Sequence, residues 1–198
     1  MKTTNTMINA VTGLGFLFMA GSASAAWNLD NNSSSLSFVS IKKDTVAEVH
    51  TFDSLSGSVG DDGAVQVDIA LASVDTGIAI RDERMQKMLF EAELFPKAVI
   101  VGDVDMKQFS QLKVGQRLET ELQLKLSLHG KSQPLNAKVM FVRLESNQLL
   151  ATSISPIIIK AADFELVKGI EALRTVAGLP SISTAVPVTF NLVFKQQN

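Results

Sequence analysis

The chain has no cysteine and no tyrosine among its 198 residues, and it has only two histidines, His50 and His129. Without cysteine the protein forms no disulfide, no thiolate zinc site and no covalent haem attachment, and it has no thiolate nucleophile. Without tyrosine it has no phenolic acid or base. Its stability must therefore come from a packed apolar core, and its length suits one domain with a substantial core.

The chain has little excess of positive or negative charge: 18 basic and 20 acidic side chains give a formal net charge of −2. No basic stripe runs along the sequence. This balance gives no electrostatic support for binding nucleic acid or an anionic membrane. We therefore expect neither of these as a partner.

Apolar runs long enough to cross a membrane are absent as well. The apolar run at residues 11–20 is too short, because a spanning helix takes about 20 such residues. With Lys2 before it and the small residues Ala23 and Ala25 after it, this run predicts a secretory signal peptide over residues 1–25. A single domain over residues 26–198, located in the periplasm or secreted and without a stable membrane anchor, follows from that prediction.

Short segments of alternating apolar and polar residues dominate the rest of the chain. The clearest is 118–128, where five leucines point to one face and charged or polar residues to the other. The other candidate strands are 36–41, 45–52, 65–71, 99–106, 135–144, 149–160 with a bend at Pro156, and 186–194. This pattern predicts an all-β domain of about eight antiparallel strands, arranged as a barrel or a sandwich.

Two segments have helical rather than strand periodicity. The first, at about residues 80–92, lies in a charged, Met-rich stretch between two strands and is expected to close one end of the sheet. The second spans 165–177, where Leu166, Ile170 and Leu173 recur at helical spacing before a stop at Gly178 and Pro180. Both are predicted to be helical insertions in the β domain.

An ordered set of short motifs resembles the YceI-like family. The motifs are Phe52-Asp53-Ser54-Leu55-Ser56-Gly57, Ser73-Val74-Asp75-Thr76, Arg81-Asp82, Met88-Leu89-Phe90, Phe95-Pro96-Lys97-Ala98, the leucine-rich strand and turn at 126–135, and Asp163-Phe164. The resemblance covers most of residues 27–195. It implies an eight-stranded, lipocalin-like antiparallel barrel that encloses an isoprenoid, a quinone-like molecule or another lipid, and it implies no enzymatic activity.

The resemblance also gives candidate binding residues. Those expected to line the ligand are Phe38, Phe52, Met85, Met88, Leu89, Phe90, Phe95 and Phe141, and those expected at a polar mouth are Arg81, Asp82 and Arg84. An alternative interpretation stays open for both groups. The apolar residues could equally form a packed core, because a barrel's inner face is apolar in either case. Arg81 could tie a strand to the helix, and Asp82 could interact with the helix N-terminus.

Three functions are compatible with these observations. The first is an exported carrier or store for a hydrophobic molecule, compatible with a homodimer, and with no cofactor beyond such a lipid. The second is a non-catalytic interaction protein whose barrel is filled by its own side chains. The third, an exported hydrolase, depends only on His50, His129 and the many serines, since the sequence has no Gly-x-Ser-x-Gly motif. No metal-ligand spacing accompanies the two histidines.

Overall fold

The computed structural model describes residues 25–145 and 147–196. The predicted signal peptide falls on residues outside this range, apart from Ala25. Twelve strands form one antiparallel sheet. Their bounds are β1 (Ala25–Leu29), β2 (Ser35–Lys42), β3 (Val46–Phe52), β4 (Leu55–Gly60), β5 (Ala64–Ala70), β6 (Val74–Asp75), β7 (Lys97–Asp103), β8 (Arg117–Leu128), β9 (Lys131–Glu145), β10 (Gln148–Ser153), β11 (Ile157–Lys160) and β12 (Ala185–Gln196).

Several of these strands are two halves of one longer strand. β1 and β2 both pair with β12, and the short helical turn η1 (Asn31–Ser33) separates them. β4 and β3 then pair with β1 and β2, and β5 and β6 pair with β4 and β3 in the same way. β10 and β11 both pair with β12. The result is a closed, eight-stranded antiparallel barrel, so the predicted fold class is confirmed.

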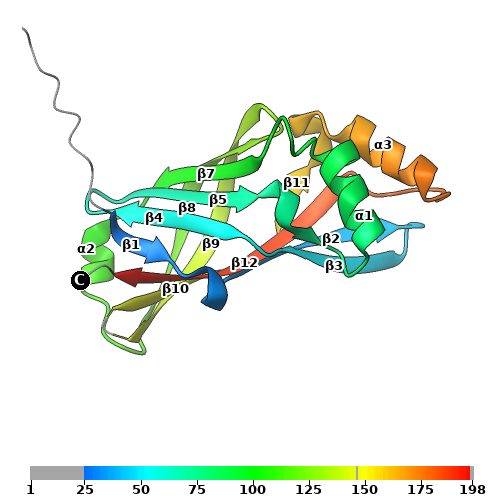
Figure 1. Cartoon of the computed structure of the whole chain (residues 1–198). Coiled ribbons are helices and arrows are strands. Elements are labelled where there is room, and N and C mark those ends of the chain that lie inside the picture. Colours follow the sequence, from blue (N-terminus) through cyan, green and yellow to red (C-terminus); the bar gives the residue numbers. More distant parts are fainter. Residues whose placement is uncertain (1–24, 146, 197–198) are drawn as a thin grey trace, which may run out of the picture.

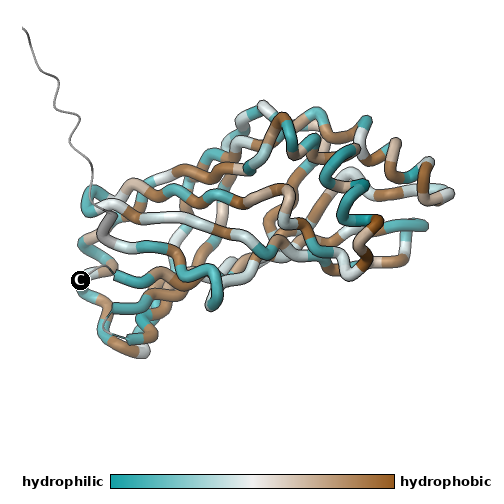
Figure 2. Tube along the Cα trace, in the orientation of Figure 1, coloured by the Kyte–Doolittle hydropathy of each residue, from teal (hydrophilic) through white to brown (hydrophobic). Residues whose placement is uncertain are grey.

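The interior of the barrel follows from the alternation of its strands, which is visible as alternating colours along the chain in Figure 2. In β8, Leu126 and Leu128 are buried, while the alternate polar residues of this strand, such as Glu119 and Glu121, are exposed. The tightest part of the core includes Leu71 and Val139, each 1% exposed. One face of each strand thus supplies the apolar interior that the cysteine-free chain requires.

The two ends of the barrel are covered by different elements (Figure 1). At one end, α1 (Ala79–Arg84) continues into the π-helical turn η3 (Met85–Leu89), and α3 (Val167–Val176) follows the turn η4 (Ala161–Phe164). We call α1, η3 and α3 the helical cover, and this end of the barrel the covered end. At the other end lies α2 (Met106–Ser110), close to β1 and the C-terminus, and we call it the α2 end.

Both predicted helical insertions are present, and the bend at Pro156 separates β10 from β11 as expected. β1, β4, the two-residue β6 and α2 were not predicted from the sequence. β4 reads LSGSVG, and its serines and glycines have low strand propensity. α2 is only five residues long, and its start is set by Asp105, whose side chain accepts a hydrogen bond from the Lys107 backbone N–H. β7 ends at Asp103 for this reason, not at residue 106 as predicted.

Within the described part of the chain, none of the helices combines the length and the apolar character that crossing a membrane requires.

Candidate functional site: a large apolar cavity under the helical cover

A cavity of about 480 Å³ lies inside the covered end of the barrel. Strand residues from nearly the whole circumference line it, and residues of the helical cover close it. The lining from the strands is largely Leu, Ile, Val and Phe, from positions whose side chains alternate inward. This part of the barrel is therefore hollow, whereas an interior filled by its own side chains would leave no such volume.

The π-helical turn η3 contributes buried side chains to the cover. The Phe90 backbone N–H donates to the Met85 carbonyl at 2.9 Å, a bond that spans five residues instead of four. Turns of this kind insert an extra residue in a helix and occur frequently at functional sites. Met85 and Leu89 are buried and line the cavity, and Phe90 follows them there.

α3 closes the cover by packing directly on η3. A Cβ atom added at Gly169 would lie 2.7 Å from the Met88 carbonyl oxygen and 2.8 Å from the Leu89 Cα. Only a glycine allows the two backbones to approach so closely. From this position α3 turns Ile170 and Leu173 into the cavity.

A row of aromatic rings forms one wall of the cavity. The rings of Phe38 on β2 and Phe52 on β3 are 5.4 Å apart, and the rings of Phe52 and Phe90 are 5.7 Å apart. His50 extends the row, with its ring 5.2 Å from that of Phe38. These spacings are typical of favourable aromatic pairs. The row connects the barrel wall to the end of η3.

Polar residues line the cavity mainly beside this aromatic wall, on β2, β3 and α1. The Ser40 hydroxyl and His50 Nε2 are hydrogen-bonded at 2.8 Å. Glu48 accepts from the Lys42 ammonium through Oε1 and from the Arg81 guanidinium through Oε2, each at 2.7 Å. The hydrogen bond from Lys42 and the charge of Arg81 hold the pKa of the Glu48 carboxyl below its usual range, so Glu48 is ionised at neutral pH.

His50 is only 3% exposed, and burial lowers the pKa of its imidazole, with the positive charge of Arg81 acting in the same direction. The ring is therefore neutral at neutral pH. Its Nδ1 atom is buried and has no hydrogen-bond partner among the described residues, and the same holds for Nε of Arg81. Two buried polar atoms are thus left without partners beside one cavity.

Arg81 joins α1 to β3, the contact that the alternative interpretation anticipated, whereas Asp82 bonds to Thr76, which precedes the helix. Arg81 donates through Nη2 to the Thr76 carbonyl at 2.6 Å, besides its bond to Glu48. Asp82 accepts from the backbone N–H of Thr76 at 2.9 Å and from its hydroxyl. Arg81 nevertheless lines the cavity, as does Arg84, and no hydrogen bond or ion pair joins the Arg84 side chain to another described residue.

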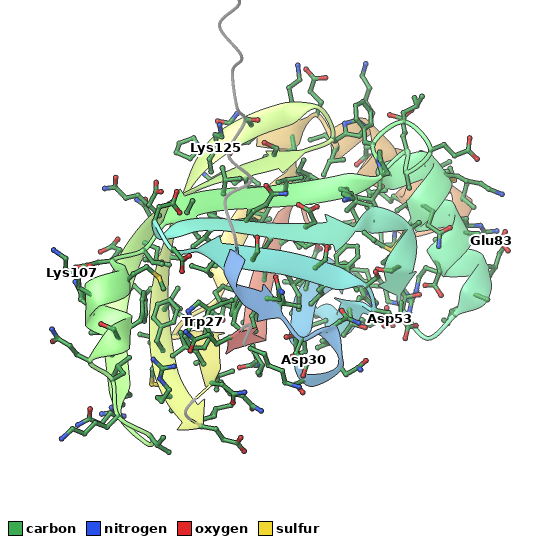
Figure 3. All side chains as sticks on the ribbon, turned by 60° about the vertical axis from the view of Figure 1, so that its left-hand side comes forward. Trp27, Asp30, Asp53, Glu83, Lys107 and Lys125 are labelled. Carbon is green, nitrogen blue, oxygen red and sulfur yellow. The ribbon has the colours of Figure 1, made fainter. Side chains whose placement is uncertain are left out.

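A second, smaller cavity of about 80 Å³ lies toward the α2 end and is lined only by apolar residues. Phe109 of α2 and Phe141 of β9 meet there edge to face, with ring centroids 4.6 Å apart. Arg143 lies 4.9 Å from the centre of the Trp27 ring and donates to the Phe109 carbonyl at 2.7 Å, and burial lowers its pKa. Figure 3 shows Trp27 among the strands at this end, whereas Lys107 of α2 projects outward.

The two cavities share a set of lining residues, which form the partition between them. These are Leu36, Ile100, Leu124 and Phe190. They come from β2, β7, β8 and β12, so the partition crosses the whole barrel interior. The hollow interior thus consists of two unequal chambers in series.

The predicted binding residues fall into three groups in the structure. Those that line the larger cavity are Phe38, Phe52, Arg81, Arg84, Met85, Leu89 and Phe90. Phe141 lines the smaller one. Three residues line neither cavity: half-buried Met88, whose backbone carbonyl abuts Gly169; Phe95, whose ring is 4.5 Å from that of His129; and Asp82, which is bonded to Thr76.

The sequence analysis missed His50 and Ser40 as cavity residues. The signal that could have found them is the pairing of β2 with β3, which places Phe38 opposite His50 and Ser40 opposite Glu48. Alternation from Phe38 then turns these residues inward.

Neither histidine is arranged for hydrolysis. Ser40 and His50 form a pair, but no carboxylate among the described residues bonds to His50 Nδ1, as a triad requires. His129 instead contacts Glu91 at 2.7 Å and the Phe164 carbonyl at 3.2 Å. Among the described residues, no group of three or more His, Cys, Asp or Glu side chains is placed to hold a metal ion.

Comparison with known proteins identifies relatives of this chain. The family model described as the YceI-like domain matches residues 27–194. A polyisoprenoid binding domain from Saccharophagus degradans, implicated in plant cell wall breakdown, has 39% sequence identity and a TM-score of 0.87, and the match covers 88% of this chain and all of that one. BcnA of Burkholderia cenocepacia has 21% identity and a TM-score of 0.65, over 83% of this chain and 98% of that one, and this likeness concerns the fold alone. No curated protein matches the chain significantly.

Proposed function

The chain belongs to the YceI-like domain family, and on that premise we propose that it is a binding protein that holds a long apolar ligand inside its barrel. The ligand is an isoprenoid, a quinone-like molecule or another lipid, and the protein carries or stores it without acting on it as an enzyme. The observation that carries this proposal is the 480 Å³ apolar cavity beneath the helical cover. The polyisoprenoid binding of the relative from Saccharophagus degradans supports the same class of ligand.

The chemistry of the cavity suits such a ligand. Burial of each methylene group stabilises the complex by about 0.8 kcal/mol, so a long chain gains affinity from burial alone. Met85 adds a flexible and polarisable side chain that adapts to ligands of different shape. The role of most lining residues is then containment, with polar groups at one point fixing the head of the ligand.

We extend the proposal to location. Residues 1–25 act as a secretory signal peptide, and the remaining domain works in the periplasm or outside the cell. A ligand of this class would there need a carrier through an aqueous compartment. Amino-terminal sequencing of the protein purified from its native host tests this, with a start at Ala26 as the expected result.

The experiment that tests the binding function is native mass spectrometry of the protein purified from its native host, followed by lipid extraction. We expect a bound apolar molecule, and a lipid-free preparation that takes up isoprenoids or quinones when they are offered. A protein that never carries a lipid and takes up none would contradict the proposal.

A matched pair of variants on α3 locates the ligand. Leu173 lines the larger cavity, so Leu173→Trp is expected to fill part of it and reduce lipid uptake. Val176 lies on the same helix, is 47% exposed and does not line the cavity, so Val176→Trp is expected to leave uptake unchanged. Equal uptake by the two variants would place the ligand elsewhere.

A further inference from the structure

The polar lining of the larger cavity is concentrated at one place. Its members are Ser40, Lys42, Glu48, His50, Arg81 and Arg84, with Ser183 in addition. The first six lie on β2, β3 and α1. Ser183 joins them, because its backbone N–H donates to the Ile41 carbonyl at 2.8 Å. The rest of the wall is apolar, so a ligand in this cavity meets polar groups at one end only.

This polar region has an excess of positive charge. Lys42, Arg81 and Arg84 are cations, and among the described residues that line the cavity Glu48 is the only anion. Both carboxylate oxygens of Glu48 are already paired, Oε1 with Lys42 and Oε2 with Arg81. Asp82 lies next to Arg81 in sequence but accepts its hydrogen bonds from Thr76. Even if Asp82 is counted, the cations outnumber the anions.

Donors in this region also lack acceptors. Arg81 Nε carries an N–H that is buried without a partner among the described residues. His50 Nδ1 is a second buried polar atom without one, and it is a donor when the Ser40 hydroxyl donates to Nε2. A buried polar group left unsatisfied destabilises a protein, so a ligand oxygen that accepts these hydrogen bonds would remove that cost.

We propose that the larger cavity takes a single-chain amphiphile with an anionic headgroup, a carboxylate or a phosphate, held by Arg81, Arg84 and His50. The chain of this ligand lies along Phe38 and Phe52 and points toward the partition at Phe190. This inference depends on the proposed binding function and specifies its ligand. A neutral headgroup, such as an alcohol or a quinone, would leave the excess positive charge uncompensated.

The test compares ligands that differ only in the headgroup. Farnesyl phosphate is matched with farnesol, and dodecanoate with dodecanol, and each is titrated into the lipid-free protein by calorimetry at low ionic strength. We expect each anionic ligand to bind about tenfold to a hundredfold more tightly than its neutral partner, the range expected for a hydrogen bond to a charged group. A preference confined to one anionic pair also supports the proposal and identifies the phosphate or the carboxylate as the headgroup.

Two variants separate a specific contact from a general charge effect. Arg84→Gln is expected to lose most of the preference for anionic ligands, because it removes a cation that faces the headgroup. Lys87 is exposed in the same segment and does not line the cavity, so Lys87→Gln is expected to keep the full preference. A preference that survives Arg84→Gln unchanged, or that Lys87→Gln reduces equally, would contradict the assignment.

The outcomes distinguish this inference from the proposed function. If neutral and anionic ligands bind equally well, the headgroup inference is wrong and the binding function stands. If none of the four ligands binds and native lipid is also absent, the proposed function itself fails.

Discussion

The two ends of the barrel belong to one closed sheet, yet one end is hollow and the other is nearly filled. The cavity at the covered end is about 480 Å³, and the cavity toward the α2 end is about 80 Å³. At the α2 end, β1 and β4 complete the ring of strands, and Phe109 packs into it from α2. At the covered end the wall is completed by the helical cover.

An arginine side chain at the α2 end has structural contacts that an arginine at the covered end lacks. Arg143, toward the α2 end, is 7% exposed and is bonded to the Phe109 carbonyl and placed over the Trp27 ring. Arg84, at the covered end, has no such contact among the described residues and borders open volume. The difference fits the proposal that the covered end binds the ligand while the α2 end contributes to stability.

The strongest test of this comparison is to truncate an aromatic ring at each end. Phe141 is 6% exposed and packs on Phe109, so Phe141→Ala should lower the free energy of unfolding by about 3–5 kcal/mol in urea denaturation. Phe52 is half-buried and borders the larger cavity, so Phe52→Ala should cost clearly less and should weaken lipid retention instead. Equal losses of stability would remove the distinction between the ends.

A smaller loss of stability is expected from a substitution at the contact between α3 and η3. Gly169→Ala places a methyl group against the Met88 carbonyl and the Leu89 Cα, so the helices must separate. Overpacking of this kind costs about 1–3 kcal/mol, despite the better helix propensity of alanine. We expect a lower free energy of unfolding and a faster release of bound lipid. Urea denaturation measures the first and the rate of lipid release measures the second.

The control for Gly169→Ala is Lys168→Ala, at the neighbouring exposed position of the same helix. It should change stability by no more than about 0.5 kcal/mol and leave lipid release unaltered. A Gly169→Ala variant that is as stable as Lys168→Ala would show that the cover is not held by this close approach.

The smallest expected change is a shift in the preferred ligand length when the partition between the chambers is opened. Phe190 lines both cavities, so Phe190→Ala should join them and shift the preference toward ligands with longer chains. The expected gain is about 0.8 kcal/mol for each additional methylene that enters the smaller chamber. Titration of the lipid-free protein with ligands of increasing chain length measures this gain in binding free energy.

Val188 lies on the same strand but lines only the larger cavity, so Val188→Ala serves as the control and should widen that chamber without lengthening the preferred chain. If Phe190→Ala shows the same length dependence as the native protein, the two cavities act independently.

The sequence was a good guide to the strands and a weaker guide to the site. Alternation located β8, β9 and β12, because a barrel strand must separate an apolar face from a wet one. It did not locate β4, whose serines and glycines carry no such pattern. Within the helical cover, Met85 and Met88 were both predicted to line the ligand, but only Met85 lines the cavity, while the Met88 backbone abuts α3.

The amino-acid sequence by itself determined that this chain forms an antiparallel β domain with two helical insertions, since periodicity and local propensity depend on neighbours along the chain. Only the tertiary structure decided that the helical cover closes a hollow space. An apolar inward face satisfies a packed core and a cavity equally, and the choice depends on how closely distant elements approach. The approach of Gly169 to η3, the ion pair of Arg81 with Glu48, and the partition at Phe190 bring together residues far apart in sequence. These contacts position the cover, the polar region and the partition.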